Sequence, residues 1–243
     1  MKIVCLIPAR GGSKRIPLKN IRLLDEMPLI AWSIATARAL DLPCYVSSDD
    51  KEILRIAGLF GAKAWDRPAR LAGDDVTDLP VVEDFLQRVE PKVDLLIYLR
   101  PTTPTRSTVM VQGAIDLMLK SGNKATGLRS IHRMTESCFK RFMLAGGLLE
   151  PLKWQGQDLT DWPEHKVPPT YKPNGYIDII IPSTIEAGSL YGESCIGYVT
   201  RQVIELDSLE EWNYLDYRLK VTGVDEVHEF YLPGGARAAP FGI

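Results

Sequence analysis

The sequence lacks the features that mark membrane, disulfide-rich and nucleic-acid-binding proteins. No apolar run approaches the roughly 18 residues that a membrane span requires, and the apolar run over residues 2–7 is too short for a signal peptide. The 4 cysteines are scattered without a Cys-x-x-Cys pair, which favours reduced, structural thiols and a cytoplasmic protein. With 29 Lys and Arg against 31 Asp and Glu, the net charge of −2 argues against a nucleic-acid partner.

The common glycine-rich nucleotide motifs are also absent. Neither Gly-x-x-x-x-Gly-Lys-Ser/Thr nor Gly-x-Gly-x-x-Gly occurs. Instead, the apolar run over residues 2–7 leads into a glycine-containing loop in which no acid precedes Asp25 and whose cations are Arg10, Lys14, Arg15, Lys19 and Arg22. Charge alone is equally typical of a solvated loop. Its position after a buried strand favours a triphosphate site, because ligands bind beyond the carboxyl ends of strands and loop N–H groups bind anions.

Strand and helix signals alternate along the chain. Strand-like apolar runs lie at residues 2–7, 44–47, 94–99, 125–130, 175–181 and 194–198. Helical spacing follows Pro28, covers residues 50–60, and recurs at Val111, Ile115 and Met118. This alternation predicts an α/β fold of three layers, a mostly parallel twisted sheet with helices on both faces, formed by residues 1–243 as a single domain.

Residues 131–172 interrupt the alternation. Residues 138–144 and 148–154 flank Ala145-Gly146-Gly147, which predicts a β-hairpin with a glycine turn. The segment fits a plain surface hairpin or a protruding dimerisation arm, and its tryptophans, 154 and 162, favour the arm because aromatic residues are enriched at interfaces. We expect the glycine- and proline-rich residues 222–243 to form a loose tail.

Two acids lie near the C-terminal end. Residues 203–207 read as a strand, whose period of two would place Glu205 and Asp207 on one face. Ser208-Leu209-Glu210-Glu211 has the form of a capping box and predicts the start of a helix. Acids at this position suit a hard cation such as Mg²⁺ held together with substrate phosphates, although spacing alone favours solvent-facing acids.

Four stretches resemble, in order and spacing, motifs of the acylneuraminate cytidylyltransferases, also called CMP-sialate synthetases. They are Ile-Pro-Ala-Arg-Gly-Gly-Ser-Lys with Lys19-Asn20, Asp-Arg-Pro-Ala-Arg-Leu-Ala at 66–72, Leu-Arg-Pro-Thr-Thr-Pro-Thr-Arg at 99–106, and Pro-Asn-Gly at 173–175. The likeness spans residues 1 to about 220 and implies a Rossmann-like nucleotidyltransferase that forms a homodimer through its hairpin. The implied reaction joins CMP from CTP to the anomeric hydroxyl of a nonulosonic acid, a 2-keto-3-deoxy sugar acid, and releases pyrophosphate.

The resemblance also implies the site residues. The implied catalytic residues are Arg10, Lys14, Lys19 and Asp207. The implied nucleotide-binding residues are Arg10, Gly11, Gly12, Ser13, Lys14, Asn20 and Arg67. The implied sugar-binding residues are Arg100, Thr102, Thr103, Lys172 and Asn174. Mg²⁺ or Mn²⁺ is the implied cofactor, with Asp207 as a ligand and Glu205 binding directly, through water or not at all.

Several positions depart from the family pattern. Arg100 replaces the usual glutamine, and either pairs with a sugar carboxylate or fills a pocket shaped for another substituent. Glu205 stands where the family usually has aspartate, and Lys172 stands where arginine is common. Residues 164–166 read Glu-His-Lys, whereas the family usually has Arg-Gln in this segment. These changes leave CTP binding intact, but they leave open which nonulosonic acid is the acceptor.

Two other functions and the general base stay open. A 3-deoxy-manno-octulosonate cytidylyltransferase also opens with Ile-Pro-Ala-Arg but lacks the Gly-Gly-Ser-Lys and Lys-Asn elements. A non-catalytic nucleotide-binding protein would explain Arg100 and Glu205 but not the retained Asp207. The histidines have no supporting neighbours that mark one as a base; they are His132, His165 and His228. Asp207 or a metal-bound hydroxide is the alternative proton acceptor.

Overall fold

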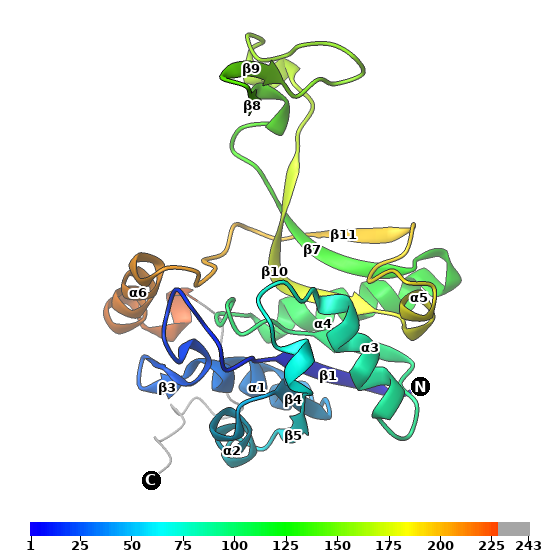
Figure 1. Ribbon diagram of the computed structural model, residues 1–243, viewed down its shortest axis with the longest axis vertical. Coiled ribbons are helices and arrows are strands. Elements are labelled where there is room, and N and C mark those ends of the chain that lie inside the picture. Colours follow the sequence, from blue (N-terminus) through cyan, green and yellow to red (C-terminus); the bar gives the residue numbers. More distant parts are fainter. Residues whose placement is uncertain (228–243) are drawn as a thin grey trace.

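A seven-stranded sheet forms the centre of the protein in a computed structural model, which describes residues 1–227 (Figure 1). The strand order is β11-β7-β10-β6-β1-β4-β5. The strands are β1 (Ile3–Pro8), β4 (Cys44–Ser48), β5 (Lys63–Asp66), β6 (Leu95–Tyr98), β7 (Gly127–Arg133), β10 (Tyr171–Ile180) and β11 (Cys195–Val199). Only β10 runs antiparallel to its neighbours β6 and β7. The predicted mostly parallel sheet is confirmed.

Helices cover both faces of this sheet. One face packs against α1 (Leu29–Ala39), α2 (Lys51–Leu59) and α4 (Thr108–Ser121), and the other against α3 (Asp78–Arg88) and α5 (Pro182–Glu186). Cys5 and Ile7 point into the first core while Val4 and Leu6 point into the second. A strand buried on both faces reads as a continuous apolar run, which is why β1 is evident in the sequence. The predicted three layers are confirmed.

Several short elements lie outside the main sheet and its covering helices. A small two-stranded sheet pairs β2 (Leu23–Leu24) with β3 (Met27–Pro28). Turns of 3-10 helix cover Lys19–Ile21, Ala69–Leu71, Gly122–Lys124, Cys138–Lys140 and Glu164–Lys166. Within the described residues, no helix has the length and apolar character needed to cross a membrane.

A third apolar cluster joins the N-terminal basic loop, residues 10–22, to α6 (Leu209–Val227). Its buried members are Ile16, Leu24, Leu29, Trp32, Leu206, Trp212, Leu215 and Leu219. The predicted capping box is confirmed, since Glu211 accepts the backbone N–H of Ser208 at 2.8 Å and Ser208 Oγ accepts that of Glu211 at 3.2 Å. Because α6 continues to Val227, the tail predicted from residue 222 begins too early; residues 228–243 lie outside the described residues.

The strand predicted over residues 203–207 is wrong. The backbone bends there, because Asp207 N–H donates to Glu205 O at 3.1 Å, an i to i+2 contact that an extended strand does not make. Leu206 is fully buried in the third cluster, and its N–H donates to Thr102 O at 2.8 Å. Burial of one leucine against α6 therefore decides the path of this segment, rather than pairing with a neighbouring strand.

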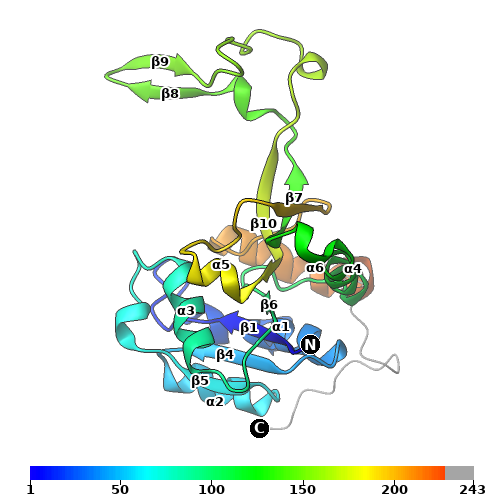
Figure 2. The same cartoon turned by 90° about the vertical axis from the view of Figure 1, so that its right-hand side faces the viewer.

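β7 and β10 extend beyond the sheet into a long arm (Figures 1 and 2). At its end, β8 (Phe142–Ala145) and β9 (Leu148–Pro151) form the predicted hairpin, joined through Gly146 and Gly147, whose φ values of 58° and 82° suit glycine. Several apolar side chains of the hairpin are largely exposed: Met143, Leu144, Leu148 and Leu149.

Candidate active site

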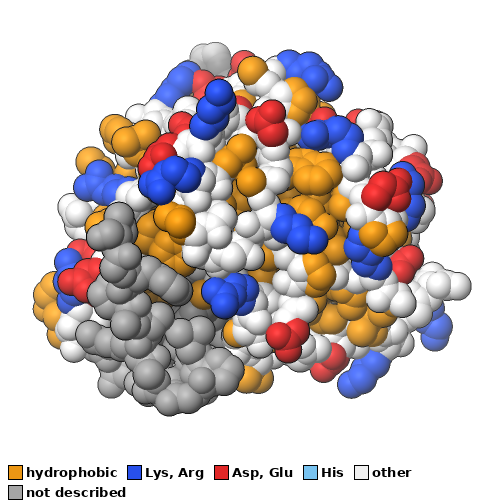
Figure 3. Space-filling model, turned by 90° about the horizontal axis from the view of Figure 1, so that it is seen from below, with side chains coloured by type: hydrophobic (Ala, Val, Ile, Leu, Met, Phe, Trp, Pro, Cys, Tyr) orange, Lys and Arg blue, Asp and Glu red, His pale blue; other side chains and the backbone are white. Residues whose placement is uncertain are grey.

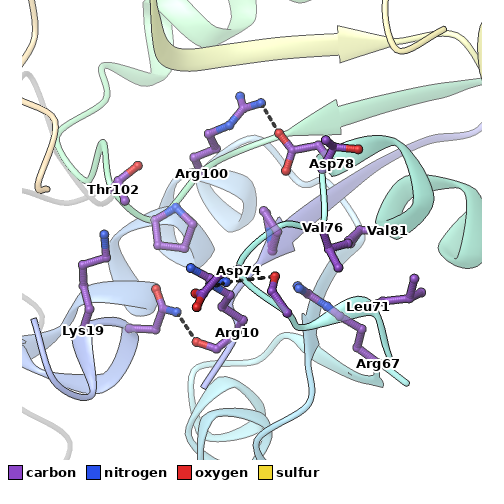
Figure 4. A pocket seen from close by; sticks show the side chains of 15 residues that line it. Arg10, Lys19, Arg67, Leu71, Asp74, Val76, Asp78, Val81, Arg100 and Thr102 are labelled. Atoms are coloured by element: carbon purple, nitrogen blue, oxygen red, sulfur yellow. Dashed lines mark hydrogen bonds and ion pairs between the residues drawn. The ribbon is translucent and has the colours of Figure 1, made fainter. Parts of the chain in front are cut away.

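A cavity of about 250 Å³ opens beyond the carboxyl ends of parallel strands (Figure 4). Arg10 follows β1, Arg67 follows β5 and Arg100 follows β6, and all three line it. The other lining residues are Pro8, Lys19, Asn20, Leu71, Gly73, Asp74, Val76, Thr77, Asp78, Val81, Pro101 and Thr102. The cavity therefore lies at the predicted edge of the sheet.

Two cations of the basic loop are paired with Asp74. Arg10 Nη1 lies 2.9 Å from Asp74 Oδ1 and donates to Gly73 O at 3.0 Å, and Lys14 Nζ pairs with the other Asp74 oxygen. The hydrogen bond from Lys14, with the charges of Lys14 and Arg10, lowers the pKa of Asp74. Asp74 is a site residue that was not predicted from the sequence, although it follows the matched segment 66–72 by two residues.

Lys19 connects the basic loop to residue 207. Its Nζ donates to Leu206 O at 3.0 Å and lies 3.5 Å from Asp207 Oδ1. Only 15% of the Lys19 side chain is exposed, against 51% of Asp207. Burial lowers the pKa of Lys19, against the opposing effect of Asp207. Asn20 is buried and donates to Arg10 O at 2.9 Å, so Asp207, Lys19 and the loop form one connected group.

Gly11 lies beside Asp50, the residue before α2, and neither Gly11, Gly12 nor Ser13 lines the cavity. Gly11 N–H donates to Asp49 Oδ1 at 3.0 Å, and a Cβ at Gly11 would lie 2.9 Å from Asp50 Cβ. Only glycine permits this close approach. Ser13 N–H donates to Gly11 O at 2.9 Å, which makes a tight turn. These residues fix the path of the loop from which Arg10 reaches the cavity.

The guanidinium groups of Arg67 and Arg100 are already bonded to other residues of the chain. Arg67 is buried and donates through Nε and Nη2 to Ser47 at 3.1 and 2.6 Å, and burial lowers its pKa. Arg100 donates through Nη1 to Asp178 and through Nη2 to Asp78 at 2.7 Å. Burial would lower the pKa of Arg100, but these two carboxylates raise it well above its ordinary value. Because both ends of its fork are occupied, a bidentate clamp on a sugar carboxylate is disfavoured.

The other predicted sugar-binding residues are divided between the cavity wall and the interior. Thr102 lines the cavity. Thr103 and Asn174 are fully buried, and Thr103 Oγ1 donates to Asn174 O at 3.3 Å, so they support the wall from behind. Lys172 is exposed at the base of the arm, with Nζ 3.7 Å from Glu205 Oε1.

Arg106 ties the loop after β6 to β10. Its side chain is fully buried and donates through Nη1 to Ser33 Oγ at 2.9 Å, through Nη2 to Arg100 O at 2.6 Å, and through Nε to Tyr176 O. Burial lowers the pKa of Arg106 to about 10. Arg106 belongs to the motif at 99–106, but its structural role was not predicted from the sequence.

A divalent cation would need carboxylate ligands near the cavity. The described part of the chain contains no group of three or more His, Cys, Asp or Glu that could hold a metal ion. Mg²⁺ needs only one or two carboxylates when phosphates and water complete its shell. Asp207, half exposed beside the cavity residue Lys19, fits such a ligand. Glu205 points to Lys172 instead, and the predicted common face for the two acids is not observed.

Neither of the two histidines in the described part of the chain provides a base at the cavity. His132 is buried at the root of the arm, His165 is exposed on the arm, and neither lines the cavity. His228 lies outside the described residues.

On the face seen in Figure 3, acidic and basic side chains are interspersed, so the described part of that face carries no broad region of one charge.

The sheet and the cation-lined cavity beyond its strand ends define an α/β nucleotide-binding protein. A family model described as "Cytidylyltransferase" matches residues 4–138, more than half of the chain. The chain belongs to the cytidylyltransferase family and is a nucleotidyltransferase.

Named relatives refine this assignment. CMP-N,N'-diacetyllegionaminic acid synthase of Legionella pneumophila is 32% identical over 224 residues, covering 87% of this chain and 94% of the relative. Pseudaminic acid cytidylyltransferase of Campylobacter jejuni is 36% identical over 130 residues, which is 51% of this chain and 56% of the relative. N-acylneuraminate cytidylyltransferase B of Danio rerio is 42% identical over 100 residues, covering 41% of this chain and 23% of the relative. These relatives support the resemblance to enzymes that make CMP derivatives of sialic-acid-like sugars.

Solved structures confirm the nucleotidyltransferase fold. CMP:2-keto-3-deoxy-manno-octonic acid synthetase complexed with CTP superposes with a TM-score of 0.68 at 16% identity, covering 90% of this chain and 99% of that chain. 4-Diphosphocytidyl-2C-methyl-D-erythritol synthase of Anaerococcus prevotii gives a TM-score of 0.63 at 11% identity, covering 90% and 98%. At such identities the likeness concerns the fold alone.

Proposed function

We propose that the protein joins CMP from CTP to the anomeric hydroxyl of a nonulosonic acid and releases pyrophosphate. The observation that carries this proposal is the contact of Asp207 with Lys19, which lines the cavity together with Arg10, so that a carboxylate lies next to a cation of the cavity wall. The Legionella relative, of which 94% is covered, supports an acceptor of the sialic-acid-like class.

The chain's own residues would supply alignment and charge. Arg10 and Lys19 would bind the triphosphate, which would displace Asp74 from Arg10 and from Lys14. Arg67, held rigidly by Ser47, would lie on the nucleoside side. Phosphoryl displacement depends mainly on such positioning and on stabilising the charge of the leaving group. A Mg²⁺ or Mn²⁺ ion held by Asp207 would neutralise negative charge on the phosphates.

Two alternatives are less well supported. The structural likeness to the 2-keto-3-deoxy-manno-octonic acid synthetase is at 16% identity, which concerns the fold alone. A non-catalytic nucleotide-binding protein would not need a carboxylate such as Asp207 next to the cavity residue Lys19, whereas a reaction that expels pyrophosphate can use the cation that such a carboxylate holds.

We further propose that the arm joins two copies of the chain. The exposed leucines of the hairpin support this, because a hairpin far from the core gains nothing from apolar side chains in water. Replacing Leu144 and Leu148 together by aspartate should convert a dimer into a monomer in sedimentation experiments, whereas Leu117→Asp on the body should not. A monomeric unaltered protein would exclude the proposal.

The free thiols of all four cysteines support a cytoplasmic location.

The reaction can be tested with a substrate panel. The purified protein is incubated with Mg²⁺, each of the four NTPs, and legionaminic, pseudaminic, N-acetylneuraminic or 3-deoxy-manno-octulosonic acid. We expect pyrophosphate release only with CTP and at least one nonulosonic acid. Turnover of the octulosonic acid alone would identify the alternative enzyme, and CTP binding without pyrophosphate would identify a non-catalytic protein.

A further inference from the structure

Asp78, the first residue of α3, presents a fixed carboxylate to the cavity (Figure 4). Its Oδ1 accepts the hydroxyl of Tyr98 at 2.8 Å, and its Oδ2 accepts Arg100 Nη2 at 2.7 Å. Arg100 is itself held by Asp178 on its other side. The side chain of Asp78 is 37% exposed, so a carboxylate clamped from behind still meets the cavity space.

The surroundings keep this group an acceptor. Burial alone would raise the pKa of Asp78, but the charge of Arg100 and the hydroxyl of Tyr98 outweigh burial and lower it. Burial raises the pKa of Tyr98 well above its ordinary value, so its hydroxyl remains a donor. A carboxylate has about four acceptor sites. The two described bonds therefore leave Asp78 able to accept hydrogen bonds from a ligand.

Asp78 lies toward the end of the cavity that suits a base. Lys19 and Thr102 lie at one end, while Arg67, Leu71 and Val81 lie at the other, near Asp78 (Figure 4). Cations suit the phosphates. Apolar side chains beside one donor, Arg67, and one acceptor, Asp78, suit the flat face and polar edge of a nucleobase.

We propose that Asp78 selects cytosine over uracil by accepting a hydrogen bond from the 4-amino group of CTP. The inference rests on the proposed function, since it requires a pyrimidine nucleotide in this cavity. Cytosine carries an amino donor at position 4, the group that Asp or Glu recognises. Uracil carries a carbonyl oxygen there, which leaves the carboxylate unpaired and facing another acceptor. A binding site discriminates strongly against a ligand that leaves one of its buried polar groups unpaired.

A purely structural role for Asp78 predicts a different result. An acid in the first turn of α3 is favourable for the helix dipole, and Asp78 also holds Arg100. Loss of either function would weaken CTP and UTP equally. The ratio of the two affinities therefore separates selection of the base from support of the wall.

Calorimetric binding of CTP and UTP to the full chain, in Mg²⁺ and without acceptor, tests the proposal. We expect the unaltered protein to prefer CTP by at least about tenfold, as one charge-assisted hydrogen bond allows. Asp78→Asn should bring the preference below about threefold, mainly by binding UTP better, because the amide can donate to the uracil oxygen. Asp75 is an exposed acid in the loop that precedes α3 and does not line the cavity, so Asp75→Asn should keep the preference.

The outcomes separate this inference from the proposed function. An unaltered protein that binds neither nucleotide contradicts the proposed function. A CTP preference that survives Asp78→Asn, or its absence from the unaltered protein, overturns the role of Asp78 alone. If Asp78→Asn does not fold, a second measurement on the unaltered protein decides the question. It uses the triphosphate of a cytidine analogue that has a hydrogen atom in place of the 4-amino group. Binding at least about tenfold weaker than CTP supports the amino contact, and equal binding overturns it.

Discussion

Replacement of Lys19 by methionine should strongly weaken the binding of CTP. Methionine keeps an unbranched side chain of similar length, so the change removes the charge with little change in shape. In the structure, Nζ is largely buried between Leu206 O and the Asp207 carboxylate, at 3.0 and 3.5 Å. A phosphate bound in the cavity would become a further partner of this ammonium group.

The size of the effect follows from that burial. A hydrogen bond to a charged group contributes about 1.5–3 kcal/mol, which corresponds to a loss of about 10- to 150-fold in affinity. Lys14 provides the comparison. The resemblance implies a nucleotide contact for it, but its side chain does not line the cavity, is 80% exposed and pairs with Asp74. An exposed ion pair contributes about 0–1 kcal/mol, so Lys14→Met should cost less than about fivefold.

The pH dependence gives an independent check on Lys19. Its pKa lies below the ordinary 10.5 because of burial. The ammonium group therefore loses its charge at a lower pH than an ordinary lysine, and CTP affinity should fall as the pH rises through that lowered value. Lys19→Arg keeps its charge and should remove this alkaline decline. The dissociation constant of CTP, measured by calorimetry, reports both effects. Equal losses in Lys19→Met and Lys14→Met would refute the assignment of Lys19.

Three further changes have defined outcomes. Arg106→Met should lower the free energy of unfolding by about 3–5 kcal/mol in urea titrations, because it leaves buried acceptors without their donor; a loss below about 1 kcal/mol would contradict this. Asp74→Asn should tighten CTP binding about twofold to tenfold by releasing Arg10, which lines the cavity, whereas weaker binding would assign Asp74 a direct role. Gly11→Ala should raise the dissociation constant of CTP by displacing the loop, and Gly12→Ala, with open space at its Cβ position, should raise it less.

The sequence predicts best those elements whose own residues decide their structure. β1 is an apolar run buried on both faces, and α6 begins at a capping box. β5 was missed because most of its side chains are exposed at the sheet edge, and α3 because it carries Pro80 and has no side-chain cap at Thr77. The bend at Leu206 depends on packing against α6, which no local pattern encodes.

The candidate site divides in the same way. Arg10, Lys19, Arg67 and Arg100 line the cavity, and all four lie in the motifs quoted from the sequence. Asp207, the partner of Lys19, was predicted from its own motif. The carboxylates that hold Arg10 and Arg100 were missed, because such pairs join distant parts of the chain; they are Asp74, Asp78 and Asp178. Asp178 meets Arg100 from 78 positions further along. The path of the loop after β6 depends on Arg106 in the same manner.

The proposal that Asp207 holds a metal ion beside the triphosphate is tested most directly by the Mg²⁺ dependence of pyrophosphate release. Initial rates are measured with CTP and an accepted nonulosonic acid for the unaltered protein, Asp207→Asn and Glu205→Gln. We expect Asp207→Asn to lower the rate at least about a hundredfold and to require more Mg²⁺ for half-maximal activity. Glu205→Gln, whose glutamate faces Lys172, should change the rate less than about threefold. An unchanged rate and metal requirement in Asp207→Asn would contradict a catalytic centre shared by Lys19 and Asp207.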